Sequence, residues 1–307
     1  MISSASQGPR ITVQLCTYNR RALLGRVLQA LFDQDIDPDA YEVVLVDDGS
    51  TDGTYEEIIA PARPRCALHV VRQKNAGLAR GRNVGTARAR GEYVLFMDDD
   101  VLATPNLVRA HLRFHETHPR SICRAGVINV ASFDDLPPPR YSWRNYSGAY
   151  FWTTNVSLPL ALLHEAGGFD ERFREYGWED LELGFRLRSM GVPSLRAHGA
   201  IVYHFKPPVA RANVPSMVRQ ARAQARTAVQ FLRKHPHWRV ALATGQIAPF
   251  RYWSGITRSV GWPKVLEALA GGENDTGRMP AAIRRWAAAR LARAAYYEEL
   301  ASASRSS

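Results

Sequence analysis

In its N-terminal part the sequence alternates short apolar runs with stretches of helical spacing, and this pattern constrains the fold more than any other feature. We expect strands over 11–19, 41–50, 67–73 and 91–100, because apolar runs of this length that end in polar turns are typical of strands. Strands separated by single helices form right-handed βαβ units. The sequence therefore predicts an α/β fold with a mostly parallel sheet flanked by helices.

After the fourth predicted strand the pattern becomes less regular. We expect a helix from about Thr104, followed by a long loop over 134–152, which is rich in proline and aromatic residues. A strand over 153–158, a helix over 177–191 and a last strand over 195–205 follow. This order predicts a smaller, mixed sheet that is built on the parallel one.

The C-terminal part carries the positive charge of the chain. Residues 206–307 hold 17 lysines and arginines against 5 acids, whereas residues 1–205 hold 23 against 24. Apolar residues at helical spacing predict a helix over 213–234, and a second helix is expected to begin at Pro280. The charge favours phosphate surfaces, either anionic lipid or nucleic acid. An arginine-rich helical face exposed to water explains it equally well.

Cysteine content and hydropathy exclude several classes of protein. The three cysteines, Cys16, Cys66 and Cys123, are too widely spaced for a disulfide framework or a CxxC metal site. No apolar run approaches the roughly 18 residues that span a bilayer, and residues 1–9 are mostly small or polar. We therefore expect a disordered N-terminus, no secretory signal and a cytoplasmic location.

Three consecutive acids, Asp98, Asp99 and Asp100, end the fourth predicted strand. Carboxylates so close together repel one another unless a cation lies between them, and hard divalent cations prefer oxygen ligands. A turn at the strand end can direct Asp98 and Asp100 to the same ion. The alternative is an exposed acidic turn that binds nothing.

Two further segments suit a nucleotide. In VDDGSTDGT (46–54) acids end the second strand, where such residues commonly bind a ribose or a base; helix capping by residues 50–52 explains the segment without a ligand. In NAGLARGRNVG (75–85) Gly77 and Arg82 lie at the opening of a helix, which suits a diphosphate. A surface helix is the alternative there, and the GxGxxG spacing of dinucleotide sites is absent.

A pair of acids, Glu179 and Asp180, opens a later predicted helix. The helix dipole stabilises carboxylates at that position without any ligand. The aromatic residue before them favours a function: Trp178 can stack on a sugar face, and Asp180 can then accept a proton from a bound hydroxyl. His204, at the end of the last strand, is by itself more typical of a core residue than of a ligand.

Six segments, in their order along residues 11–205, resemble the family 2 glycosyltransferases: CTYNR (16–20), VDDGSTDGT (46–54), NAGLARGRNVG (75–85), GEYVLFMDDD (91–100), GGFDERF (167–173) and GWEDLELGFRL (177–187). The resemblance implies a nucleotide-sugar-binding fold of the GT-A type. It implies a catalytic domain over 10–205, with a nucleotide-binding half over about 10–118 and an acceptor half over about 119–205. The basic helical extension, 206–307, lies outside these motifs.

The resemblance also implies a role for each matching residue. Donor binding is implied for Thr17, Tyr18, Arg20, Asp48, Gly77, Arg82, Asp98 and Asp99, and metal binding, with Mg²⁺ or Mn²⁺ as cofactor, for Asp100, Asp98 and His204. The implied catalytic residues are Asp180, as the general base, and Glu179, which would hold the acceptor; acceptor binding is also expected for Trp178, Trp152 and Asn155. Many relatives lack the middle acid, Asp99, so the resemblance leaves open which two of the three acids face the ion.

These roles predict an inverting transfer of a sugar from a nucleoside-diphosphate sugar, by default a UDP-sugar, to a hydroxyl of a glycan or lipid-linked acceptor, as in polysaccharide biosynthesis at the cell envelope. The alternatives are a sugar-phosphate nucleotidyltransferase, which would carry a glycine-rich signature after the first strand, and a non-catalytic scaffold or nucleic-acid binder. The acids at 98–100 and 179–180 favour the transferase. For 206–307 we expect peripheral attachment to an anionic membrane, packing on the catalytic domain, or a homodimer contact.

Overall fold

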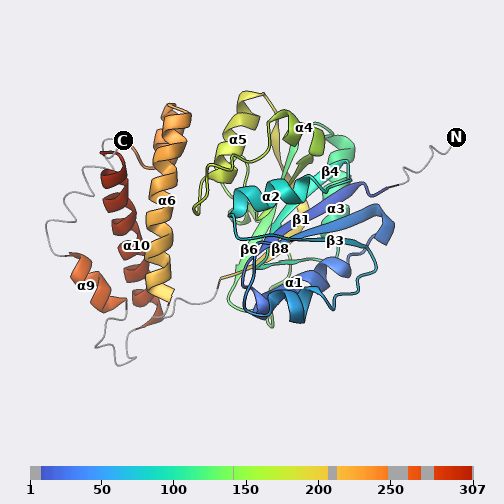
Figure 1. Cartoon of the computed structure of the whole chain (residues 1–307), viewed down its shortest axis with the longest axis horizontal. Coiled ribbons are helices and arrows are strands. Elements are labelled where there is room, and N and C mark those ends of the chain that lie inside the picture. Colours follow the sequence, from blue (N-terminus) through green and yellow to red (C-terminus); the bar gives the residue numbers. More distant parts are fainter. Residues whose placement is uncertain (1–7, 141, 207–212, 248–261, 271–279, 306–307) are drawn as a thin grey trace. The chain divides into compact units, whose positions relative to one another are not determined.

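The structure is a computed structural model, and it describes residues 8–140, 142–206, 213–247, 262–270 and 280–305. The chain divides into two compact units (Figure 1). One unit, which we call the sheet unit, comprises Met1–Arg174 and Glu179–Lys206. The other, which we call the helical unit, comprises Glu175–Trp178 and Pro207–Ser307.

A single eight-stranded sheet runs through the sheet unit, in the order β3-β2-β1-β4-β7-β6-β8-β5. The strands are β1 (Ile11–Thr17), β2 (Tyr41–Asp47), β3 (Ala67–Arg72), β4 (Tyr93–Asp98), β5 (Val101–Ala103), β6 (Ile122–Val130), β7 (Asn155–Pro159) and β8 (Ser194–Phe205). Strands β3, β2, β1 and β4 are parallel neighbours, as are β6 and β8, whereas β7 and β5 are antiparallel to their neighbours. The predicted α/β fold with a mostly parallel sheet is confirmed.

The register of the parallel strands brings their ends together. Cys16 of β1 pairs with Asp98 of β4, and Thr17 of β1 pairs with Asp47 of β2. Strands β1 and β2 are buried along their whole length, which is why their sequences are nearly continuous apolar runs. The loops that follow β1, β2 and β4 therefore gather at one edge of the sheet, which we call the carboxyl edge.

Helices cover both faces of this sheet (Figure 1). Residues of α1 (Arg21–Phe32) and α3 (Leu107–Thr117) are buried in one hydrophobic core. Residues of α2 (Leu78–Thr86), α4 (Leu160–Glu165) and α5 (Glu179–Ser189) are buried in a second core. Each helix thus buries an apolar stripe against the sheet, which is the main source of stability for helices of this length.

The structure adds several details to the expectation drawn from the sequence. The later strands join the parallel ones in one sheet, because β7 pairs directly with β4. The segment after residues 50–52, for which helix capping was one explanation, forms a π-helix, η2 (Thr54–Ile59). Short 3₁₀ helices occur at η1 (Pro38–Ala40) and at η3 (Trp143–Asn145), the latter inside the stretch expected as a long loop.

The helical unit contains α6 (Val214–Lys234), α7 (Trp238–Ala243), α9 (Trp262–Leu269) and α10 (Ala281–Ala303). The helix expected over 213–234 and the one expected from Pro280 are both present. The apolar stripe of α6 is used within this unit, since Ala225 and Val229 pack with Leu300 of α10. Within the described ranges, no helix combines the length and the hydropathy that crossing a membrane requires.

Candidate active site

The acids that follow β4 lie at the carboxyl edge beside a basic partner from the loop after β1. Asp99 Oδ1 accepts a hydrogen bond from Arg20 Nε at 3.1 Å, and Asp100 Oδ2 accepts one from Arg20 Nη2 at 3.4 Å. Asp100 Oδ1 also lies 3.5 Å from Nε2 of His204, which ends β8 together with Phe205. The structure thus brings together four of the residues that the sequence singled out.

Burial and the repulsion between the carboxylates shift the pKa values of Asp99 and Asp100, and burial shifts that of His204. Burial raises the pKa of Asp99 to about 6, against the opposing charge of Arg20. Burial, reinforced by the charge of Asp98, raises the pKa of Asp100 to about 6. Burial lowers the pKa of His204 to about 4, so its imidazole is neutral at pH 7. A divalent cation would relieve the repulsion between these carboxylates.

The atoms at this place fit such a cation chemically. Carboxylate oxygens and a neutral imidazole are suitable ligands for Mg²⁺ or Mn²⁺, and His204 Nδ1 is buried with no hydrogen-bond partner among the described residues. Among the described residues, no group of three or more His, Cys, Asp or Glu side chains lies close enough together to hold a metal ion. The assignment of Asp98, Asp100 and His204 as ligands stays a prediction.

A buried arginine joins the acids after β4 to the acids of α5. Arg82 of α2 donates from Nη1 to Glu179 Oε1 at 2.7 Å and from Nη2 to Asp98 Oδ1 at 3.4 Å. The Arg82 and Glu179 side chains are 6% and 7% exposed. Although burial lowers the pKa of Arg82, the charges of Glu179 and Asp98 raise it above its ordinary value. The bridge Asp98–Arg82–Glu179 is therefore a fixed, charged connection between the two groups of acids.

The carboxyl group next to this bridge titrates near neutrality. Asp180 is 7% exposed, and its pKa is raised to about 7, first by burial and then by the negative charge of Glu179. Its Oδ1 accepts a hydrogen bond from the backbone N–H of Leu181 at 2.7 Å. A carboxyl group with a pKa near the working pH is suited to general base catalysis.

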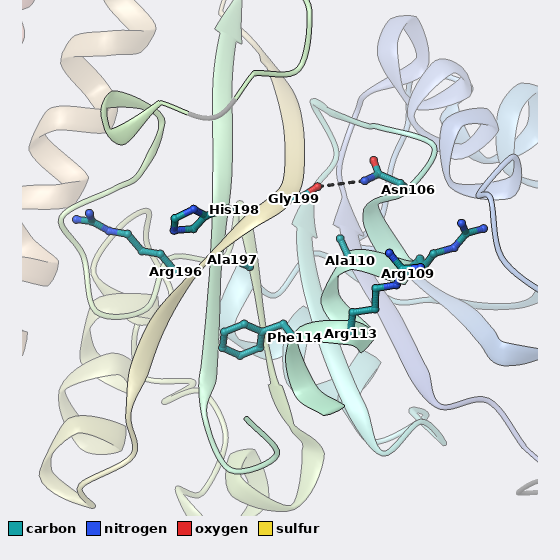
Figure 2. Close-up of a pocket in the computed structure, with 9 residues that line it drawn as sticks. All are labelled: Asn106, Arg109, Ala110, Arg113, Phe114, Arg196, Ala197, His198 and Gly199. Carbon is teal, nitrogen blue, oxygen red and sulfur yellow. Dashed lines mark hydrogen bonds between the residues drawn. The ribbon is translucent and has the colours of Figure 1, made fainter. Parts of the chain in front are cut away.

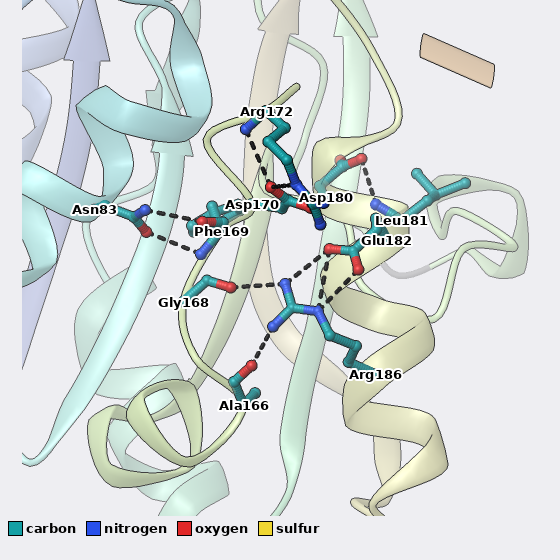
Figure 3. A network of polar contacts seen from close by, with 10 residues as sticks. All are labelled: Asn83, Ala166, Gly168, Phe169, Asp170, Arg172, Asp180, Leu181, Glu182 and Arg186. Carbon is teal, nitrogen blue, oxygen red and sulfur yellow. Dashed lines mark hydrogen bonds and ion pairs between the residues drawn. The ribbon is translucent and has the colours of Figure 1, made fainter. Parts of the chain in front are cut away.

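An ion pair one turn further along α5 fixes the helix to the preceding turn (Figure 3). Arg186 donates to Glu182 from Nε at 2.9 Å and from Nη2 at 2.7 Å. Arg186 also donates to the backbone carbonyls of Ala166 and Gly168. Because Glu182 is fully buried, this pair anchors the helix that carries Asp180.

The acid after β2 is bound by the loop that leads into α2. Asp48 accepts hydrogen bonds from Gln73 Nε2 at 2.7 Å, from the backbone N–H of Ala76 at 2.9 Å and from that of Gly77 at 3.0 Å. Gly77 has φ +88°, and a Cβ at this position would lie 2.8 Å from the carbonyl oxygen of Arg174. Asp48 therefore shapes the loop before α2, and only glycine fits at its turn.

The other predicted donor and acceptor residues of the sheet unit are placed in different ways. Thr17 is buried at the end of β1, and Tyr18 beside it is 47% exposed. Trp152 is half-buried against the larger core. Asn155 is buried, and its amide bonds to the Gly126 carbonyl and to a ring nitrogen of α3. The Asn155 amide thus makes these hydrogen bonds inside the protein, and its acceptor role stays a prediction.

Trp178 lies in the helical unit, although the next residue in the chain, Glu179, lies in the sheet unit. Its indole Nε1–H donates to the Gln224 carbonyl at 2.8 Å, and its ring lies 6.3 Å from that of Phe231. The ring is half-buried among residues of α6 and α10. Its predicted stacking on a sugar is not tested by this arrangement.

Sequence reasoning missed three partners of the site. It did not pair Arg82 with Glu179, because their side chains meet over a separation of 97 residues. Thr154, whose Oγ1 donates to Asp98 Oδ2 at 2.7 Å, carries no signal in the sequence. The spacing of Glu182 and Arg186 could have been read, since an acid four residues before an arginine is the favoured order on a helix.

A separate hollow of about 530 Å³ lies between α3 and the first half of β8 (Figure 2). Its lining consists of Asn106, Arg109, Ala110, Arg113, Phe114, Arg196, Ala197, His198 and Gly199. Three arginines give this lining a positive charge. Two of them already have partners, because Arg109 lies 2.7 Å from an oxygen of Asp35 and Arg196 stacks over the ring of Tyr146. The predicted catalytic and binding residues are not among those that line this hollow.

Comparison with known proteins shows which family the chain belongs to. The sequence profile of glycosyl transferase family 2 matches residues 12–173. The validoxylamine A glucosyltransferase of Streptomyces hygroscopicus subsp. limoneus is 30% identical over 301 residues, which cover 85% of this chain and 62% of that protein. The chondroitin synthase of Escherichia coli is 27% identical over 241 residues, which cover 64% of this chain and 35% of that protein.

Two solved structures share the fold. S. aureus TarS 1–349 in complex with UDP-GlcNAc has a TM-score of 0.58 and 20% identity, covering 97% of this chain and 91% of that one. The mannosyltransferase PcManGT from Pyrobaculum calidifontis, in complex with GDP-Man and Mn²⁺, has a TM-score of 0.56 and 23% identity, covering 97% and 86%. With the profile match over more than half of its length, the chain belongs to glycosyl transferase family 2.

Proposed function

We propose that this protein moves a sugar from a nucleoside-diphosphate sugar, with a UDP-sugar as the default donor, to a hydroxyl group of a glycan or lipid-linked acceptor. The observation that carries the proposal is the bridge Asp98–Arg82–Glu179, in which Arg82 and Glu179 are buried. It leads from the end of β4 to a carboxyl group, Asp180, whose pKa is about 7. Relatives named as a glucosyltransferase and a chondroitin synthase support sugar transfer as the reaction class.

In the proposed step, Asp180 accepts the proton of the acceptor hydroxyl while the hydroxyl oxygen forms a bond to the anomeric carbon of the donor sugar. The bond from that carbon to the diphosphate oxygen breaks in the same step, and the nucleoside diphosphate leaves with the electron pair. Attack from the face opposite the leaving group inverts the anomeric configuration. Arg82 keeps the carboxylates of Glu179 and Asp98 in fixed positions through its two hydrogen bonds.

A divalent ion is part of this proposal. Asp100, Asp98 and His204 would hold Mg²⁺ or Mn²⁺, whose charge would stabilise the leaving diphosphate. The raised pKa values of Asp99 and Asp100, both about 6, support a cation at this place. The Mn²⁺ complex of the mannosyltransferase with the same fold supports it as well.

The substitution Asp180→Asn tests the role of the base, because it keeps the shape of the side chain and removes its ability to accept a proton. The donor nucleotide is first identified by thermal shift with UDP, GDP and dTDP in the presence of Mn²⁺. We then expect kcat to fall by about 10²–10⁴-fold in the variant, while the nucleotide raises the melting temperature as in the wild type. Asp134→Asn, which changes a carboxylate that is 80% exposed, is the control. Turnover of Asp180→Asn within a few-fold of this control would refute the assignment.

Attachment of the helical unit to an anionic membrane stays a prediction based on charge. Because the apolar stripe of α6 packs inside the unit, such binding would depend on the arginines and would be lost as salt screens them. Flotation with anionic vesicles at low and high salt measures it. Equal flotation at both salt concentrations would contradict the prediction.

A further inference from the structure

Two of the three acids after β4 bind the same guanidinium group, that of Arg20. Asp99 Oδ1 accepts from Arg20 Nε at 3.1 Å, and Asp100 Oδ2 accepts from Arg20 Nη2 at 3.4 Å. We infer that Arg20 is a tethered counter-cation that competes with the divalent ion for Asp100, while Asp99 keeps its guanidinium group in place. The inference rests on the proposed function, since it concerns the ion of that site. All the residues involved lie in the sheet unit.

The first acid of the three does not depend on Arg20. Asp98 Oδ1 accepts from Arg82 Nη2 at 3.4 Å, and Asp98 Oδ2 accepts from Thr154 Oγ1 at 2.7 Å. Both carboxylate oxygens of Asp98 are therefore bound by donors on α2 and in the segment just before β7. The guanidinium group of Arg20 is shared between the two acids that follow.

Asp99 is the closer and less exposed partner of Arg20. The two ion pairs measure 3.1 Å for Asp99 and 3.4 Å for Asp100, and the carboxylate side chains are 12% and 20% exposed. The attraction between charges is stronger at a shorter distance and where water is excluded. A cation that approaches Asp100 would therefore break the contact from Nη2 first and leave the contact between Nε and Asp99. This assigns the middle acid the role of an anchor.

Asp100 lies where the two cations compete. One of its oxygens, Oδ2, binds Arg20, and the other, Oδ1, lies 3.5 Å from Nε2 of His204. His204 Nδ1 is buried without a hydrogen-bond partner among the described residues. A divalent ion bound to Asp100 and a guanidinium group on the same carboxylate would repel each other. Binding of the ion should therefore be weakened by Arg20.

The main chain at Arg20 keeps the guanidinium group within reach of the acids. The backbone N–H of Arg20 donates to Thr54 Oγ1 at 3.0 Å. The Arg20 carbonyl accepts from the backbone N–H groups of Leu23 and Leu24, both at 3.0 Å, where α1 begins. The side chain itself is 43% exposed, so it has room to move. Because these backbone contacts do not involve the guanidinium group, a substitution of the side chain should leave the loop after β1 in place.

The substitution Arg20→Met tests the competition by metal binding alone. We expect the full-length variant, without any donor, to bind Mn²⁺ roughly tenfold more tightly than the wild type, because the competing charge is removed. Electron paramagnetic resonance of free Mn²⁺ measures this affinity. Arg21→Met is the matched control, since Arg21 carries the same charge but binds the exposed Glu57 at 2.9 Å. Equal Mn²⁺ affinities for the two variants, or no Mn²⁺ binding by either, would overturn the inference.

Thermal stability gives a second readout that does not depend on turnover. Without a divalent ion, Arg20→Met should melt at a lower temperature than the wild type, because Asp99 and Asp100 lose their counter-charge. Added Mn²⁺ should raise the melting temperature more in Arg20→Met than in the wild type, since the more tightly bound ion stabilises the folded state further. Arg20→Lys, which keeps a charge without the planar fork, should lie between them. Equal rises in Arg20→Met and wild type would contradict the competition.

The anchoring role of Asp99 is tested in the background of Arg20→Met. If Asp99 acts by holding Arg20, adding Asp99→Asn to this variant should weaken Mn²⁺ binding by less than about tenfold, through the loss of one nearby charge. Adding Asp100→Asn instead should abolish Mn²⁺ binding. A loss of binding with Asp99→Asn as complete as that with Asp100→Asn would show that Asp99 is itself a ligand, and would overturn its role as an anchor.

Failure of the inference can be told apart from failure of the proposed function. If Asp180→Asn retains turnover while Arg20→Met binds Mn²⁺ more tightly than the wild type, the proposed base fails and the competition stands. If Asp180→Asn is inactive and Arg20→Met binds Mn²⁺ as the wild type does, only the inference fails.

Discussion

Two buried carboxyl groups of the sheet unit, Glu42 on β2 and Asp180 at the start of α5, have pKa values that are shifted in opposite directions. At the amino end of β2, Glu42 is fully buried and accepts hydrogen bonds from Thr12 Oγ1 at 2.6 Å and from Arg90 N and Nε at 2.6 and 3.0 Å. Although burial raises the pKa of Glu42, these donors hold it below its ordinary value. Beyond the carboxyl edge, Asp180 is also buried, but its pKa is about 7.

The difference separates a carboxylate that stabilises the fold, Glu42, from the carboxyl group that we propose as the general base, Asp180. The donors around Glu42 compensate the loss of water, so its charged form is favoured in the folded state. Asp180 faces the negative charge of Glu179, so its charged form is disfavoured. A buried group that is poorly compensated costs stability, and such groups concentrate at functional sites. Burial alone therefore does not identify a catalytic acid; the balance of its partners does.

The largest expected effect comes from removing the residue that compensates the acids of the site. Arg82→Ala leaves Glu179 buried without its 2.7 Å partner, and breaking a buried ion pair in this way costs about 3–5 kcal/mol. Urea denaturation measures this loss, and transfer activity should be lost with it. Arg82→Lys, which keeps the charge, should lose less of both. Wild-type stability of Arg82→Ala would show that the bridge does not hold the site together.

A smaller effect, on stability alone, is expected at the opposite end of the sheet. Glu42→Gln weakens the hydrogen bonds from Thr12 and Arg90, and losing charged hydrogen bonds at a buried site costs roughly 1–3 kcal/mol. Because Glu42 is remote from the carboxyl edge, kcat per folded molecule should stay at the wild-type value. Urea denaturation and active-site titration measure the two quantities. A tenfold loss of kcat in folded Glu42→Gln would contradict the distinction between Glu42, which acts on stability, and Asp180, which acts on turnover.

The smallest effect is a difference in how stability depends on pH. The folded-state pKa of Asp180, about 7, lies above its ordinary value of 3.8, so Asp180 makes the folded state less stable as pH rises from about 4 to 7. Asp180→Asn should remove this loss, so its stability relative to wild type should increase as pH rises from 5 to 8. The pKa of Glu42 is lowered, so Glu42 should stabilise the folded state at neutral pH, and this stabilisation should be lost as pH falls. Parallel stability curves for wild type and Asp180→Asn between pH 5 and 8 would contradict the raised pKa.

The carboxyl edge could be predicted from the sequence because parallel strands impose it. Once 11–19, 41–50 and 91–100 were read as parallel strands, the polar residues after them had to lie at the same edge. The apolar runs were nearly continuous because these strands are covered on both faces. This explains why Asp48, Asp98 and the two acids that follow were located without any knowledge of their partners.

The partners themselves could not be predicted, because they depend on side chains that meet across long separations. Nothing local distinguishes Arg82, which binds Glu179, from Arg80, which binds the exposed Glu171. The amphipathic pattern of 213–234 predicted a helix but not what covers its apolar stripe, which is α10. Nor does any pattern in the sequence show that Trp178 packs among residues of this helical unit.

The central claim is that Asp180 is a buried carboxyl group poised to exchange a proton near neutral pH. Carbon-13 NMR of the aspartate carboxyl groups, recorded between pH 3 and 9 for wild type and Asp180→Asn, measures this directly. The account predicts one carboxyl resonance that titrates at about 7 and is absent from Asp180→Asn. A resonance assigned to Asp180 that titrates at or below its ordinary value of 3.8 would contradict the account.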